Sequence, residues 1–229
     1  MIKKKINLSD QKKYWEQHKN KRTFDHSIVN LFSQQRIDYL KQYLDVTKIK
    51  SAFDYGCGDG FSCYYMNKFI PHIEGGDVSE FMLRNNPLSK KFLHVLDGEH
   101  LPFSDNSFDM VYCWEVLHHV ENPDIVMREM ARVASNYVVV FEPNRNNIAQ
   151  FLFGLFKKEE RGTLRFNLKY LKRLAMSNDL RILHFSNVGW IFPNVTPTWI
   201  VPILKVLPYE FPFLPISCCL IAEKVKVGR

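Results

Sequence analysis

The sequence predicts an α/β protein whose core is a doubly wound, largely parallel sheet. After residue 50, seven short apolar runs alternate with stretches of helical periodicity, and the connections between most of them are short. Such alternation places helices on both faces of a parallel sheet. The 229 residues are 46% hydrophobic and contain no internal repeat or low-complexity linker, so we expect residues 1–229 to form a single domain with one full core.

Residues 1–46 are expected to form a helical cap that precedes the sheet. Apolar residues recur at helical spacing in two stretches, 10–18 and 28–44, which predicts two helices. The first 22 residues carry a net charge of +6, whereas the rest of the chain sums to +1. This is unlike the broad basic face of a nucleic-acid-binding protein, so no nucleic acid partner is expected. The basic cluster fits a solvated terminus or a contact with an anion or a membrane surface equally well.

The predicted core, residues 47–143, holds the first five strands. They are expected at 51–55, 72–77, 91–97, 108–114 and 136–142, with helices at about 59–69, 79–86 and 122–133. A further helix at about 167–178 and strands at 180–185 and 217–225 complete the pattern.

Two apolar segments, 144–166 and 190–215, interrupt this alternation. The second contains six of the chain's eleven prolines, which exclude a membrane-spanning helix and favour a stiff extended path. We expect both segments to lie over the edge of the sheet where substrates bind, with Trp199 in the wall of an acceptor pocket. Packing of the two segments against each other or against a second subunit is the alternative, so an oligomer is also considered. The run 148–156, followed by several cations, also has the character of an element at a membrane interface.

A glycine-rich turn follows the first predicted strand, in the sequence Asp54-Tyr55-Gly56-Cys57-Gly58-Asp59-Gly60. Glycines allow a tight turn and a close approach of a ligand to the backbone. The second strand ends in Asp77, where a doubly wound sheet places the carboxylate that accepts hydrogen bonds from ribose hydroxyls. The third strand ends in Asp97 at the same edge. Acidic strand ends beside one glycine turn predict a nucleoside site that favours a cationic ligand over a phosphate.

Four stretches, FDYGCGDG, GGDVSEFML, LDGEHLPFSDNSFDMVYCWEVLHHVENPD and VVVFEPN, resemble the class I S-adenosylmethionine-dependent methyltransferases, in the group that includes ubiquinone and menaquinone biosynthesis enzymes. The resemblance covers about residues 50–143. It implies a Rossmann-like seven-stranded sheet with an antiparallel last strand. It also implies S-adenosyl-L-methionine as cofactor, with S-adenosyl-L-homocysteine as product.

The same resemblance implies a set of cofactor-binding residues. The glycine turn would lie against the methionine part with Asp54 near its amino group, Asp77 would hold the ribose, and Asp97 would accept from the adenine amino group. The full set is Tyr14, Trp15, Asp54, Tyr55, Gly56, Cys57, Gly58, Gly60, Asp77, Val78, Asp97, Gly98, Cys113 and Trp114. For the acidic strand ends, a helix cap or a turn former is the structural alternative.

Three residues are candidates for catalysis, because methyl transfer to an oxygen acceptor requires a proton to be removed. His118 and His119 follow the fourth strand and titrate near neutrality, and Glu142 ends the fifth strand. The structural alternative is that one histidine packs or caps a helix while the other lies on the surface. No paired ligand spacing among Cys and His residues is present, so no metal site is expected.

The sequence leaves the acceptor open between several classes. The apolar segments favour a small molecule or lipid, such as an isoprenoid quinone precursor or a lipid-linked saccharide, with peripheral membrane contact as an option. A methyltransferase acting on RNA or protein is the main alternative, and a binding module without turnover is a third. Five scattered cysteines without a CxxC pair or a signal-peptide pattern favour a reducing compartment, so we expect a cytoplasmic protein, membrane-associated in the lipid case.

Overall fold

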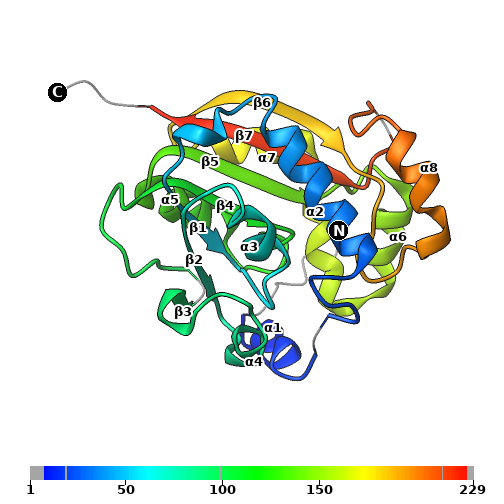
Figure 1. The fold of residues 1–229 in the computed structure, drawn as a ribbon, viewed down its shortest axis with the longest axis horizontal. Coiled ribbons are helices and arrows are strands. Elements are labelled where there is room, and N and C mark those ends of the chain that lie inside the picture. The colour runs from blue at the N-terminus through cyan, green and yellow to red at the C-terminus, as the bar shows by residue number, and fades with distance from the viewer. Residues whose placement is uncertain (1–7, 19, 98, 213, 226–229) are drawn as a thin grey trace.

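The computed structural model describes residues 8–18, 20–97, 99–212 and 214–225, and these form a seven-stranded sheet with helices on both faces (Figure 1). The strand order is β3-β2-β1-β4-β5-β7-β6. Strands β1 to β5 pair in parallel, and β7 pairs antiparallel with both β5 and β6. The predicted fold class, including the antiparallel last strand, is confirmed.

The strands lie where the apolar runs predict them, within a few residues. Their bounds are β1 Ser51–Tyr55, β2 His72–Asp77, β3 Leu93–Val95, β4 Phe108–Trp114, β5 Ala134–Pro143, β6 Leu180–Val188 and β7 Ser217–Lys224.

The predicted helices are also present, most of them shorter than expected. Their bounds are α1 Leu8–Trp15, α2 Ser27–Leu40, α3 Phe61–Met66, α4 Glu80–Arg84, α5 Pro123–Val133 and α7 Leu168–Met176. Helix α3 begins late because Gly60, its N-cap, has a φ of 89°, a left-handed conformation that no helical residue adopts.

Both interrupting segments contain helices. In 144–166, α6 Ile148–Phe156 begins at Asn147, whose side chain accepts from two backbone N–H groups, and the 3-10 helix η3 Lys158–Arg165 follows. In 190–215, the expected extended path is wrong over 198–206, where η4 Thr198–Ile200 and α8 Val201–Val206 form. A proline is tolerated in α8 because it lies in the first turn, where the missing N–H has no helical partner.

Two apolar cores lie on opposite faces of the sheet. Side chains alternate along β4, so Tyr112 and Trp114 join the core under α2 and α3, while Val111 and Cys113 join the core under α5 and α7.

The carboxyl ends of β1, β2, β4, β5 and β6 meet at one edge of the sheet, because these strands all run in the same direction. The segment 190–215 connects β6 to β7 at that edge, since Val188 and Pro143 both pair with Ser217.

None of the helices in the described part of the chain combines the length and the apolar character needed to cross a bilayer.

Candidate functional site

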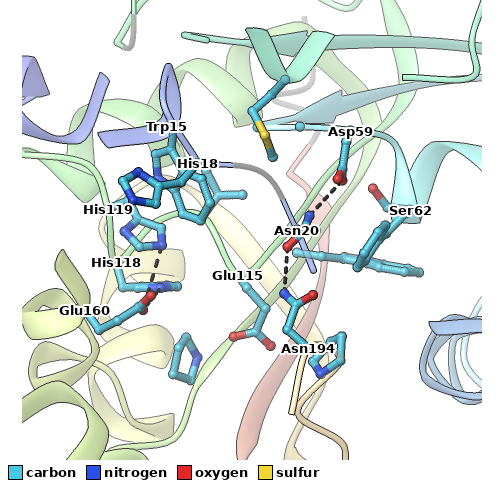
Figure 2. Close-up of a pocket in the computed structure, with 18 of the residues that line it drawn as sticks. Trp15, His18, Asn20, Asp59, Ser62, Glu115, His118, His119, Glu160 and Asn194 are labelled. Carbon is cyan, nitrogen blue, oxygen red and sulfur yellow. Dashed lines mark hydrogen bonds and ion pairs between the residues drawn. The ribbon is translucent and has the colours of Figure 1, made fainter. Parts of the chain in front are cut away.

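A cavity of about 640 Å³ lies at the carboxyl edge of the sheet. Its wall combines the glycine turn, the ends of β2 and β4, helix α1, and residues from both interrupting segments (Figure 2). Among the predicted cofactor residues, those that line it are Tyr14, Trp15, Tyr55, Gly56, Cys57, Gly58, Asp77, Val78 and Trp114. Elements far apart in the sequence thus share one cavity, of a size typical for a bound small molecule.

The glycine turn lies tightly against its surroundings. Gly56 has a φ of 74°, and a Cβ atom there would lie 2.4 Å from Val116 Cγ1. The backbone N–H groups of Gly56 and Cys57 donate to the Gly76 carbonyl at 2.7 and 3.0 Å. Only glycine fits at position 56, which leaves the backbone bare toward the cavity.

Asp77 ends β2 with its carboxylate in the cavity wall. One oxygen, Oδ2, accepts from the Gly58 N–H at 3.0 Å, and the other accepts from the Ser79 N–H at 2.9 Å. Burial raises the pKa of this carboxyl to about 6. A half-buried carboxylate with remaining lone pairs is suited to accept hydrogen bonds from paired ligand hydroxyls.

Helix α1 closes one side of the cavity. It is held by the Ser79 hydroxyl, which donates to the Trp15 carbonyl at 3.1 Å, and by the Glu80 N–H, which donates to the Glu16 carboxylate at 3.0 Å. Trp15 packs edge-on to His119, with ring centroids 5.5 Å apart. These contacts place Tyr14 and Trp15 at the cavity.

Four predicted cofactor residues do not line the cavity. Asp54 is fully buried beneath the turn, accepts from Ser62 and from Cys63 Sγ, and has a pKa raised to about 7 by burial. Gly60 is the N-cap of α3, and Cys113 lies in the core under α5 and α7. Asp97 is exposed and accepts from the backbone N–H groups of the next turn, as the turn-former alternative describes. Gly98 lies outside the described residues.

The three catalytic candidates lie together, in a cluster completed by Glu160. The Glu142 carboxylate accepts from three backbone N–H groups of residues 116–118 and from His118 Nδ1, the last at 2.8 Å. His118 Nε2 then faces Glu160 Oε2 at 3.4 Å, and His119 Nε2 lies 3.9 Å from the same oxygen (Figure 2). Glu142 is buried behind His118, while His118, His119 and Glu160 line the cavity.

The residues of this cluster have shifted pKa values, which set the charge of each side chain. Burial opposes the charge on His118, but the carboxylates of Glu142 and Glu160 prevail and raise its pKa to about 10. Burial and the adjacent His118 lower the pKa of His119 to about 3. At neutral pH, His118 is therefore protonated and His119 carries an unprotonated nitrogen. Against its own burial, Glu160 has a lowered pKa because both histidines favour its carboxylate form.

A polar bridge among cavity-lining residues was not predicted. Asn20 Nδ2 donates to Asp59 at 2.7 Å, and Asn20 Oδ1 accepts from Asn194 Nδ2, also at 2.7 Å (Figure 2). Arg22 adds a bond to the Pro193 carbonyl at 2.7 Å. The bridge joins the N-terminal cap, the glycine turn and the segment 190–215.

Two further polar residues near the cavity were also missed. Arg36, buried in α2, pairs with Glu115, a cavity-lining residue whose φ is 60°, and donates to the Ser217 hydroxyl at 3.2 Å. Neither Glu115 nor Glu160 belongs to a sequence motif that would have marked it as a site residue. In sequence, Glu160 is one of two acidic residues in a basic stretch, and only the fold brings it to the histidines.

Comparisons with known proteins identify the domain and the fold. Residues 53–140 match a family model described as a methyltransferase domain. A ubiquinone biosynthesis O-methyltransferase of Hydrogenovibrio crunogenus is 28% identical over 133 residues, which cover 55% of each chain. The chain spans about half the length of most of the curated relatives it matches.

Two solved structures share the fold. A methyltransferase of Thermotoga maritima, described as a possible histamine N-methyltransferase, superposes with a TM-score of 0.65 at 17% identity and covers 86% of this chain and 92% of its own. A geranyl diphosphate C-methyltransferase of Streptomyces coelicolor, in complex with S-adenosyl-L-homocysteine, has a TM-score of 0.64 at 13% identity, with coverage of 95% and 98%. The match over residues 53–140 identifies a methyltransferase domain in this chain, and the fold around it is that of solved S-adenosylmethionine-dependent methyltransferases.

Proposed function

We propose that the protein transfers a methyl group from S-adenosyl-L-methionine to a hydrophobic small-molecule or lipid acceptor. The observation that carries this proposal is a cavity that the glycine turn and Asp77 share with a histidine–carboxylate cluster, with an apolar part of its wall formed by Phe153, Ile191, Phe192 and Val195. One part of the cavity suits a nucleoside with a cationic sulfur, and the other suits an acceptor.

The residues present fit the cofactor. The bare backbone at Gly56 allows close contact with its methionine part, and the lone pairs of Asp77 suit its ribose hydroxyls. Cys57, Tyr14, Trp15, Val78 and Trp114 are proposed to enclose it. When bound, the cofactor supplies an electrophilic methyl group on a sulfonium sulfur.

The histidine–carboxylate cluster is proposed to take up the acceptor. His118 already holds a proton between Glu142 and Glu160, so it is a poor proton acceptor, and Glu142 acts by orienting it. His119 and Glu160 are unprotonated and line the cavity, and we propose that they accept hydrogen bonds from the acceptor and orient it. Their lowered pKa values make both of them weak bases, so we propose that the acceptor's proton leaves to water.

The acceptor class is inferred from α6 and the residues after β6. Phe153 of α6 and Ile191 and Phe192 form an apolar part of the cavity wall. The names of two similar proteins, a ubiquinone biosynthesis O-methyltransferase and a geranyl diphosphate C-methyltransferase, refer to compounds with an isoprenoid character and support this class.

Contact with a membrane surface is proposed from the outer faces of α6 and α8. Ile148, Phe156, Trp199 and Val206 are 76%, 81%, 74% and 81% exposed, and Asn147 joins the two segments by donating to the Leu214 carbonyl at 2.5 Å. The basic residues Lys158, Arg161 and Lys205 are also exposed beside these faces.

Methyl-labelled cofactor, incubated with purified protein and fractionated cell extract, tests the proposal. We expect label in the organic-soluble fraction, and we expect Asp77→Ala to abolish most of it. Label in RNA or in protein would instead support the alternative acceptors. Tight binding of S-adenosyl-L-homocysteine without any labelled product would reduce the protein to a binding module.

A further inference from the structure

We propose that His118, His119 and Glu160 form a binding site for a divalent transition-metal ion, for which Zn²⁺ is a suitable probe. The three ligand atoms, two imidazole nitrogens and one carboxylate oxygen, lie within 4.8 Å of one another. This inference rests on the proposed function, because the ion would lie where the acceptor enters. It differs from the expectation that the protein has no metal site.

The distances suit one ion shared by three ligands. A tetrahedral Zn²⁺ with bonds of about 2.0–2.1 Å sets neighbouring ligand atoms about 3.4 Å apart. His118 Nε2 lies 3.4 Å from Glu160 Oε2, and His119 Nε2 lies 3.9 Å from the same oxygen. Both distances are too long for a good hydrogen bond, and the wider one requires closure by about half an ångström. The remaining pair of ligand atoms, the two imidazole nitrogens, lies within 4.8 Å and must also move closer to share the ion.

The surroundings of the cluster hold its members in place for an ion. His118 Nδ1 donates to Glu142 at 2.8 Å, the outer-shell carboxylate–histidine contact that leaves Nε2 as the ligand atom. Arg165, in the same 3-10 helix as Glu160, donates to the His118 and Val120 carbonyls at 3.3 and 2.7 Å. Glu160 is therefore fixed against the turn that carries both histidines.

The donor set and its position indicate a catalytic type of site. Two histidines and one carboxylate leave a coordination position for another group, and all three residues line the cavity. An acceptor oxygen bound there would have a lowered pKa and would lose its proton to water more readily.

Calorimetry of chelator-treated, tag-free protein with Zn²⁺ tests the site directly. We expect one ion per chain, and we expect His119→Ala and Glu160→Gln each to weaken binding at least about a hundredfold. His100→Ala is the matched control, because His100 is exposed and lies outside the cavity, and it should bind as the wild type does. Co²⁺ loading should produce the visible absorption of a four-coordinate site, and this absorption should be lost in both variants.

Melting temperatures establish that each variant is folded. Wild-type protein that binds no Zn²⁺, or binding that is equal in both variants and the control, would overturn the inference. S-adenosyl-L-homocysteine binding and methyl transfer are measured separately. If wild-type protein binds no Zn²⁺ but still binds S-adenosyl-L-homocysteine and transfers a methyl group, only the metal site fails. If Zn²⁺ binds but no methyl group is transferred, only the proposed function fails.

Discussion

At the scale of single residues, Asp77 joins the glycine turn to the end of β2 and presents a half-buried carboxylate to the cavity. We expect Asp77→Asn to weaken binding of S-adenosyl-L-homocysteine at least about tenfold, because charge-assisted bonds to ribose hydroxyls are lost. Calorimetry measures this, with Asp38→Asn as a control, since Asp38 is an exposed carboxylate of α2. Equal affinities of wild type and Asp77→Asn would refute the ribose assignment.

The same carboxylate predicts how cofactor affinity depends on pH. The pKa of Asp77 is raised to about 6 in the free protein, so the carboxyl is largely protonated at pH 5 and ionised at pH 7. Only the ionised form accepts two hydroxyl bonds, so affinity should rise between pH 5 and 7. The profile of Asp77→Asn should be flatter over this interval, and a wild-type profile without a rise would contradict the prediction.

The contribution of Asp77 to the free energy of unfolding changes with pH in the direction opposite to the cofactor affinity. A folded-state pKa above the unfolded value means that the folded protein binds more protons between about pH 4 and 6. For this residue alone, the free energy of unfolding therefore falls as the pH rises through that interval. Cofactor binding, which favours the ionised form, offsets this loss.

At the scale of elements, α6 has two apolar faces with different surroundings. Gly154 lies against η3, where a Cβ atom would come within 2.1 Å of Thr163 Oγ1, and Phe153 lines the cavity. Ile148 and Phe156 face outward. The inner face therefore shapes the cavity, whereas the outer face is free to contact a surface.

Trp199 corrects one sequence-based expectation. It was expected in the wall of the acceptor pocket, but it does not line the cavity and is 74% exposed. Trp199 lies in the 3-10 helix at 198–200, whereas the prolines of this segment had predicted an extended path. Its substitution should therefore leave activity toward a water-soluble acceptor unchanged.

Replacement of the exposed apolar side chains tests membrane contact. The double variant Phe156→Ser and Trp199→Ser should reduce sedimentation with vesicles containing anionic lipid by at least about tenfold, because two large interfacial side chains are lost. The melting temperature should change little, because both residues are exposed. A large fall in melting temperature, or a change in oligomeric state, would instead show that these faces pack against protein.

At the scale of the whole molecule, the cavity is lined by segments that lie far apart in the sequence. Asn20 links Asp59 of the glycine turn to Asn194 of the segment 190–215. We expect Asn20→Ala to increase the dissociation rate of S-adenosyl-L-homocysteine several-fold, because one variant removes both bonds of the bridge. Stopped-flow displacement measures this rate. Asn85→Ala, on the exposed side of α4, serves as control, and equal rates would show that the bridge does not close the cavity.

The sequence was sufficient to predict the α/β sheet and the position of the glycine turn at its edge, because these depend on local signals. Short apolar runs specify strands, and the glycines at 56 and 58 specify a tight turn with positive φ. Since carboxyl ends of parallel strands meet at one edge, Asp77 and the turn could be placed together. Asp54 and Asp97 carry the same signal, yet one is buried below the turn and the other is exposed. Chain order does not specify which way a side chain points within a turn.

What the sequence by itself determined is thus the α/β fold, the methyltransferase resemblance and the position of the glycine turn beside Asp77. Only the tertiary structure decided that Glu160 meets His118 and His119, that Asn20 reaches Asn194, and that Trp199 faces outward. The physical reason is that periodicity and turn preferences act over a few neighbouring residues. Contacts between distant segments depend on how helices and loops pack together, which no local pattern records.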